Sequence, residues 1–251
     1  MRSDLQKLGL TDGQAVLVHS SFKSLGLKNN KPGDVINVLV QAIGDSGTLL
    51  VPTLTYSNVT KDNPVFESAK TPSCIGAIPN SMLQMPGIYR SLSPTHSVAA
   101  IGKLAGPLTA GQEKDHTPVG ENSPFCRLPE VGGKILMLGC GPEPNTSMHG
   151  VEEQINPSYL LEPDGTDFIC IDSKNNKHKV SIYCHNFKIK NQIVKQRYDR
   201  LLSILDKEDY RIGKVLQADC VLIDAKAMWK KAFKKLKADP YFSFLKAFFH
   251  M

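Results

Sequence analysis

Length, composition and charge restrict what this chain can be. It has 251 residues, 41% hydrophobic and 22% charged, with a formal net charge of +6, which is typical of a globular protein rather than a disordered one. No apolar run approaches the ~18 residues of a membrane span, and residues 1–9 lack the apolar centre of a signal peptide. We therefore expect a cytoplasmic protein that does not interact with membranes.

The first part of the chain alternates helical and strand patterns. The N-terminal segment from Met1 should be an amphipathic helix that ends at Gly9, and a second helix should begin at Pro32-Gly33-Asp34 and run to residue 43. Shorter helical segments are predicted at 78–83 and 125–128. Buried strands are predicted at 15–19, 47–52, 97–102 and 134–138. This alternation predicts an α/β fold, with a central mixed sheet flanked by helices.

The pattern changes near residue 162. Residues 168–172 and 179–184 flank Asn175-Asn176 and predict a β-hairpin. A helix at 192–205, a strand at 213–223 and a helix at 226–236 should follow. We interpret residues 1–251 as a single domain with a C-terminal hairpin-and-helix lobe from about residue 162.

The distribution of lysines and cysteines argues against a nucleic-acid partner and against a zinc site. Basic residues concentrate at 186–200 and 225–237; the second cluster has helical spacing, so its lysines are expected on a solvated helix face. No nucleic-acid recognition motif accompanies them, and no nucleic-acid partner is expected. The six cysteines are scattered without a Cys-x-x-Cys pair, which favours reduced thiols and argues against a zinc site. We expect no metal.

His149 and Glu152 follow a glycine-rich turn after the strand predicted at 134–138. Residues three apart share a face of a helix, so the imidazole and the carboxylate can point into one space. A carboxylate on one ring nitrogen fixes the tautomer and leaves the other nitrogen basic, as a general base requires. A surface ion pair is the alternative explanation of this spacing.

Polar residues also collect where other predicted strands begin or end. His19, Ser20, Ser21 and Lys23 follow the first strand, and Thr95, His96 and Ser97 precede the third. Backbone N–H groups, hydroxyls and a lysine in such turns can hold a phosphate or a carbonyl group. They can also be ordinary loop residues. Convergence on one sheet edge, together with His149, favours a binding site.

Several blocks of the sequence resemble the aminoglycoside 3-N-acetyltransferase family. They are Leu17–Ser21, Gly47–Thr53, Thr71–Pro79, Arg90–Gly102, Thr117–Pro124 and Gly133–Glu153. The resemblance spans residues 5 to 240 and implies the α/β fold type of that family. It also implies acetyl-CoA as co-substrate and direct acetyl transfer to an amine, with His149 as the base and Glu152 as its orienting residue. The residues that it places against coenzyme A are His19, Ser20, Ser21, Lys23, Thr95, Ser97, Val98, Thr117 and Ser123.

Other reactive residues leave alternatives open. His96 lies in a specific block and is either catalytic or a residue that holds its turn. Cys140 is close in sequence to the His–Glu pair, but a thioester needs no covalent cysteine once a base and oxyanion donors are in place. His116, His178, His185 and His250 are interpreted as loop or tail residues.

The acceptor is the open part of the prediction. Family members that act on aminoglycosides carry a long acidic insert, whereas residues 58–70 are short here and residues 184–190 are basic. A basic wall disfavours polycations and suits an amino sugar linked to a nucleotide. The alternatives are therefore an aminoglycoside, a nucleotide-linked amino sugar of surface-glycan or natural-product biosynthesis, and a non-enzymatic coenzyme A or small-molecule binding protein. A homodimer is compatible with the sequence, because residues 242–249 could pack in cis or on a partner.

Overall fold

A mixed sheet of seven strands forms the centre of the protein, which we describe from a computed structural model covering residues 1–189 and 192–244. The strand order is β11-β12-β6-β1-β2-β5-β4. Strands β6, β1 and β2 run parallel, and the others run antiparallel to their neighbours. The predicted α/β fold with a mixed sheet is confirmed. The strands are β1 (Ala15–Ser20), β2 (Thr48–Pro52), β4 (Tyr89–Arg90), β5 (Val98–Gly102), β6 (Lys134–Leu138), β11 (Tyr210–Val215) and β12 (Ala218–Asp224).

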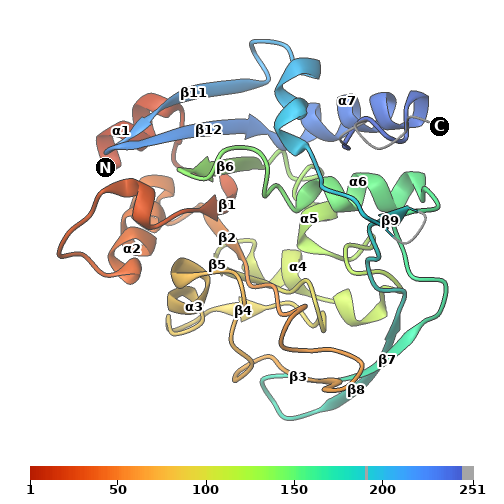
Figure 1. Ribbon diagram of the computed structural model, residues 1–251. Coiled ribbons are helices and arrows are strands. Elements are labelled where there is room, and N and C mark those ends of the chain that lie inside the picture. The colour runs from red at the N-terminus through yellow and green to blue at the C-terminus, as the bar shows by residue number, and fades with distance from the viewer. Residues whose placement is uncertain (190–191, 245–251) are drawn as a thin grey trace.

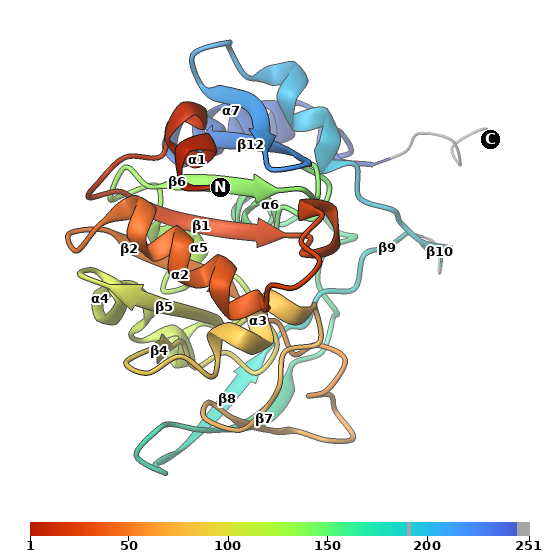
Figure 2. The same cartoon turned by 90° about the vertical axis from the view of Figure 1, so that its left-hand side faces the viewer.

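Helices cover both faces of this sheet (Figures 1 and 2). On one face lie α1 (Arg2–Leu8), α2 (Pro32–Ile43) and α3 (Ala77–Met82); on the other lie α4 (Ala105–Thr109), α5 (Pro124–Arg127), α6 (Ser147–Ile155) and α7 (Ala225–Ala238). Successive side chains of β1 alternate between the two cores: Val16 and Val18 pack with α2, and Leu17 packs with Met148 and Trp229. His19 therefore shares the α6 side of the sheet with Leu17.

A second sheet of three strands stands beside the main one, in the order β3-β7-β8. It combines β3 (Val65–Glu67) with the predicted hairpin, which consists of β7 (Thr166–Ile171) and β8 (Lys177–Ile182). Asn175 takes the left-handed conformation in the hairpin turn, with φ 64°. Strands β9 (Lys188–Ile189) and β10 (Gln192–Ile193) pair with each other. Short 3₁₀ segments complete the fold: η1 (Lys23–Leu25), η2 (Gln112–Lys114) and η3 (Tyr198–Ile204).

Two predicted elements in the C-terminal part are wrong. The helix expected at 192–205 is strand β10 followed by η3, and the single strand expected at 213–223 is the hairpin of β11 and β12. The hairpin turn contains Leu216, with φ 54°, and Gln217, so it carries none of the usual turn residues. Strands β11 and β12 of the C-terminal part extend the main sheet.

The register of the sheet brings the predicted polar segments to one edge. Ser20 at the end of β1 lies beside Leu138 at the end of β6, and Pro52 at the end of β2 lies beside Val98 at the start of β5. His19 in β1, His96 in the loop before β5 and His149 on α6 therefore share this edge, where ligands bind in open α/β sheets. Figure 2 shows β1 and β6 pointing toward the side on which β9 lies.

Two sequence-based expectations concern the chain as a whole. All six cysteines, each within the described residues, are free thiols. Over residues 1–189 and 192–244, no helix is both long and apolar enough to cross a bilayer.

Candidate active site

A cavity of about 840 Å³ opens at this edge of the sheet. The end of β1, the loop before β5, helix α6 and the segment between β8 and η3 all contribute to its wall. Its polar lining includes the three histidines that sequence analysis placed near the strand ends and three further aromatic side chains. The lining residues used below are His19, Ser20, Tyr56, Lys61, Thr95, His96, Glu143, His149, Glu162, Asp164, His185 and Tyr198.

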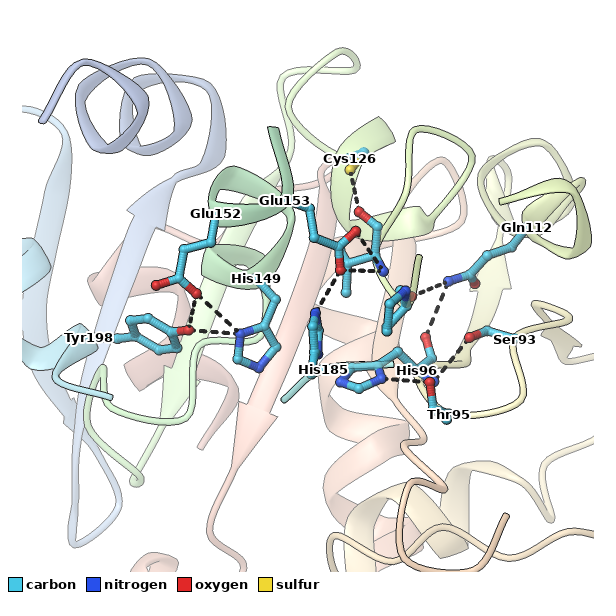
Figure 3. A network of polar contacts seen from close by, with 12 residues as sticks. Ser93, Thr95, His96, Gln112, Cys126, His149, Glu152, Glu153, His185 and Tyr198 are labelled. Carbon is cyan, nitrogen blue, oxygen red and sulfur yellow. Dashed lines mark hydrogen bonds and ion pairs between the residues drawn. The ribbon is translucent and has the colours of Figure 1, made fainter. Parts of the chain in front are cut away.

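His149 lies on α6 and is joined to Glu152 through a tyrosine (Figure 3). The Tyr198 hydroxyl donates to Glu152 Oε2 at 2.6 Å, and its oxygen is 2.7 Å from His149 Nδ1. The direct distance from His149 Nδ1 to Glu152 Oε2 is 3.8 Å, longer than a hydrogen bond. The predicted pairing is therefore corrected in one respect: Glu152 reaches His149 through Tyr198.

The hydrogen bonds from His149 through Tyr198 to Glu152 determine which ring nitrogen of His149 carries the proton. The single hydroxyl proton of Tyr198 is directed at Glu152, a carboxylate that can only accept, so the tyrosine oxygen must accept from His149 Nδ1–H. The proton of neutral His149 then sits on Nδ1, and Nε2 keeps its lone pair. Glu152 is fully buried, whereas the His149 side chain is 14% exposed and lines the cavity. This is the state that a general base requires.

A second buried pair, His185 and Glu153, stands beside the first. His185 Nε2 lies 2.7 Å from Glu153 Oε1, and the Glu153 carboxylate also accepts from the backbone N–H of Val119. Burial raises the pKa of Glu153 to about 7, against the lowering effect of hydrogen bonds from Thr117 and Val119. Burial, with a smaller contribution from His149, holds the pKa of His185 well below its usual value. His185, interpreted from the sequence as a loop or tail residue, lies in the segment between β8 and β9, and its ring packs 4.8 Å from that of His149 between centroids.

His96 and His19 complete the histidine-rich wall. The His96 ring lies 5.8 Å from His149 and 4.9 Å from His185, and its Nδ1 is 2.9 Å from Thr95 Oγ1. Burial, assisted by the other two histidines, holds the pKa of His96 well below its usual value. Burial lowers the pKa of His19 to about 3. Both imidazoles are therefore neutral near pH 7.

Helix α6 approaches α7 closely because of one glycine. A Cβ atom at Gly150 would lie 2.6 Å from the Trp229 ring and 2.9 Å from the Val119 side chain. Gly150 follows His149 directly, so this close approach sets the depth at which the imidazole enters the cavity. The sequence shows a glycine at position 150, but only the packing of α6 against α7 explains why a larger residue would not fit there.

The residues expected to contact coenzyme A fall into two groups. His19, Ser20 and Thr95 line the cavity, together with His96. The others lie outside the described lining. Ser21 bonds to the Ser24 hydroxyl at 2.8 Å, and Lys23 is exposed on η1.

Four of the expected contacts also have partners within the framework of the protein. Ser97 is fully buried and bonds to Thr53, and Val98 belongs to the hydrophobic core. Ser123 caps the N-terminus of α5 by accepting from the N–H of Cys126. Thr117 is a hydrogen-bond partner of Glu153. Cys140 is also outside the described lining, and burial raises the pKa of its thiol to about 12, which disfavours a nucleophilic thiolate.

Charges on the cavity wall differ from the basic wall expected from the sequence. Three carboxylates, Glu143, Glu162 and Asp164, line it, against one lysine, Lys61, among the described lining residues. Lys188 lies outside this lining and approaches Glu162 at 3.8 Å. Lys190, which was expected beside it, lies outside the described residues, as do residues 245–251, which include His250 and most of segment 242–249.

Sequence analysis missed Tyr198 and His185 as site residues. Tyr198 was placed inside a predicted helix, and nothing in its local pattern marks a partner for a glutamate 46 residues earlier. His185 follows a strand of the second sheet, whose position against α6 is a tertiary property. The signal that could have identified them is weak: both fall in the segment after the hairpin, close to the basic cluster.

Comparisons with known proteins agree with this architecture. The family model described as aminoglycoside 3-N-acetyltransferase matches residues 17–237. Aminoglycoside N(3)-acetyltransferase VII of Streptomyces paromomycinus is 31% identical over 166 residues, which cover 59% of this chain and 57% of that protein. The corresponding enzyme IV of a Salmonella species is 29% identical over 246 residues, 94% of this chain and 85% of the relative.

A solved structure shows the same fold. The AAC-IIIb binary complex with CoASH superposes with a TM-score of 0.78 at 24% identity, and the match covers 94% of each chain. The family model spans well over half of the sequence, and its range contains both His149 and Tyr198. The chain belongs to the aminoglycoside 3-N-acetyltransferase family.

Proposed function

We propose that this protein transfers the acetyl group of acetyl-CoA to an amino group of a cationic amino sugar of the aminoglycoside class. The observation that carries the proposal is the Glu152–Tyr198–His149 chain, which ends in a free Nε2 at the cavity wall. Relatives named aminoglycoside N(3)-acetyltransferases and a CoASH complex among its structural relatives support the choice of acceptor and donor.

The proposed mechanism is direct transfer. His149 Nε2 takes a proton from the acceptor amine as the nitrogen attacks the thioester carbonyl, which forms the C–N bond. The tetrahedral intermediate collapses with cleavage of the C–S bond, and the departing thiolate takes the proton from the imidazolium. Acetylated amine and coenzyme A leave, and the enzyme returns to its starting state. The buried Glu152 carboxylate stabilises the transient positive charge through the Tyr198 hydroxyl.

The remaining histidines shape the reacting space. His96 and His185 are neutral near pH 7, so they do not repel an ammonium ion that approaches His149. We assign His96 to contact with the reacting groups, because it lines the same cavity as His149 and its ring lies 5.8 Å away between centroids. Ser20 and Thr95 supply hydroxyls to the same wall, and we place the thioester end of coenzyme A against them.

The carboxylates of the wall favour a cationic acceptor. Glu143, Glu162 and Asp164 can attract and orient ammonium groups that are not transferred. A second candidate acceptor, an amino sugar linked to a nucleotide, is favoured by Lys61 in the lining and by Lys195, which approaches Glu143 at 3.1 Å. Release of Lys195 from Glu143 would offer its ammonium group to a phosphate.

A thiol-release assay tests the proposal. Acetyl-CoA is presented with gentamicin, kanamycin and sisomicin in one arm and with nucleotide-linked amino sugars in the other, and products are identified by mass. We expect turnover in the first arm, abolished in His149→Ala. Turnover in the second arm alone would select the second candidate. Coenzyme A binding by calorimetry with no turnover in either arm would indicate a binding protein.

A further inference from the structure

The histidine cluster has a property that base catalysis does not use. His96, His149 and His185 can each present one ring nitrogen such that the three nitrogens lie within 4.8 Å of one another. They come from three separate parts of the chain: the loop before β5, helix α6 and the segment after β8. Figure 3 shows the three rings gathered between Tyr198 on one side and Thr95 on the other.

Each of these rings has a partner on its other nitrogen. His149 Nδ1 bonds to Tyr198, His96 Nδ1 bonds to Thr95 Oγ1, and His185 Nε2 bonds to Glu153. The nitrogens left over are Nε2 of His149, Nε2 of His96 and Nδ1 of His185. Histidines that bind metals in proteins almost always have such a partner on the second nitrogen, which fixes the tautomer and orients the ring.

One of the leftover nitrogens is otherwise unexplained. His185 Nδ1 is buried and has no hydrogen-bond partner among the described residues. A buried polar atom without a partner carries a free-energy cost, and a metal ion would remove it. When the Glu153 carboxylate is ionised it can only accept, so it draws the ring proton to Nε2 and leaves the lone pair on Nδ1.

We propose that His96, His149 and His185 bind a divalent transition metal ion, with zinc the best match, and that the bound ion inhibits the enzyme. Three imidazoles and one open position form a common tetrahedral zinc site. Zinc–nitrogen bonds of about 2.0–2.1 Å place tetrahedral ligands about 3.3 Å apart, so small rotations of the rings close the gap. The site opens to the cavity, where a water molecule would take the fourth position.

A bound metal ion would inhibit the enzyme because it would occupy the lone pair on His149 Nε2. A metal ion on Nε2 occupies the electrons that must accept the proton of the amine. This half of the inference rests on the proposed function, whereas metal binding itself does not. Binding is therefore measured without substrate, and inhibition separately.

Cobalt(II) is the probe, because tetrahedral Co²⁺ with nitrogen ligands absorbs visible light. Protein freed of metal with a chelator is titrated with Co²⁺, and Zn²⁺ is then added in competition. We expect one equivalent of tetrahedral Co²⁺ that Zn²⁺ displaces. His185→Gln removes the ring nitrogen but can still donate to Glu153, and His96→Asn removes a second ligand. Each should weaken binding at least tenfold.

Further variants separate the site from other metal ligands. His178→Asn, on β8 beside Asp172, is the matched control and should bind as the wild type does. Glu153→Gln should weaken binding about 10- to 100-fold, as loss of a residue that orients a metal ligand does. Thermal unfolding identifies any variant that fails to fold, and the remaining variants then decide the outcome.

The outcomes are distinct. Absence of a tetrahedral spectrum, a thiolate-to-cobalt band, or equal binding by His185→Gln, His96→Asn and wild type would overturn the metal site. If Co²⁺ binds as expected, Zn²⁺ should stop acetyl transfer at the concentration that fills the site; turnover unchanged at saturation would overturn the inhibitory role. No acetyl transfer with any acceptor would contradict the proposed function and leave the metal site standing.

Discussion

The hydroxyl of Tyr198 is expected to be essential to the base, and Tyr198→Phe tests this with the loss of one oxygen atom. Two hydrogen bonds disappear: the one to Glu152 Oε2 at 2.6 Å and the one to His149 Nδ1 at 2.7 Å. Glu152 is fully buried, and its Oε1 has no hydrogen-bond partner among the described residues. The substitution therefore removes the 2.6 Å hydroxyl donor from a buried carboxylate whose other oxygen has no such partner.

The magnitude follows from hydrogen bonds to charged groups, which are worth about 1.5–3 kcal/mol each. We expect the free energy of unfolding to fall by about that amount. If the bond to Glu152 acts fully in the transition state, the same energy corresponds to a decrease in kcat of about 10- to 150-fold. The KM for acetyl-CoA should change little, because Tyr198 orients the base.

The assay is steady-state thiol release, combined with chemical denaturation. Tyr210→Phe is the control, since Tyr210 packs against the same core but lies outside the described cavity lining. The double variant Tyr198→Phe with Glu152→Gln should be no slower than the worse single variant, because residues that act as one unit are not additive. A kcat for Tyr198→Phe within threefold of wild type, or losses that multiply in the double variant, would refute the role of Tyr198.

Four further predictions concern the site and its support. His149→Ala should lower kcat at least ~100-fold with little change in coenzyme A affinity, as loss of general base catalysis does; calorimetry and thiol release check this, and more than a third of the rate remaining would exclude His149 as the base. Glu162→Gln with Asp164→Asn should raise KM for gentamicin and leave KM for acetyl-CoA unchanged, whereas unchanged constants for both would place the acceptor elsewhere. Gly150→Ala should cost about 1–3 kcal/mol by overpacking and lower kcat, as denaturation and kinetics would show; wild-type stability would mean that α7 yields easily. The pKa of His19 in the folded protein, about 3, lies below its value of about 6.5 in the unfolded chain. Between these two values the unfolded state binds more protons, so the free energy of unfolding falls as pH drops, by about 2 kcal/mol at pH 5. His19→Gln should flatten the dependence of stability on pH from 7 to 5, and an unchanged slope would contradict this.

Tertiary structure decided the parts of the site that sequence analysis missed. Tyr198 stands between His149 and Glu152 only because η3 packs against α7 and brings its first residue beside α6. Likewise, His185 meets Glu153 because the second sheet places the end of β8 against the cavity. Contacts between residues 32 to 49 positions apart leave no local periodicity to read. Ser97 and Ser123 were expected to contact coenzyme A, and the structure shows their hydroxyls in hydrogen bonds within the protein framework.

The sequence by itself determined the alternation of strands and helices, the ends of most elements and the identity of the central histidine. These features depend on local spacing: apolar runs for β1, β2, β5 and β6, proline and glycine at the ends of α1 and α2, and the i, i+3 relation of His149 to Glu152. Strand order, the hairpin of β11 and β12, and the charge of the cavity wall came only from the tertiary structure. They depend on which distant segments bury apolar surface against each other, and a carboxylate such as Glu162 faces the cavity or the solvent according to that packing.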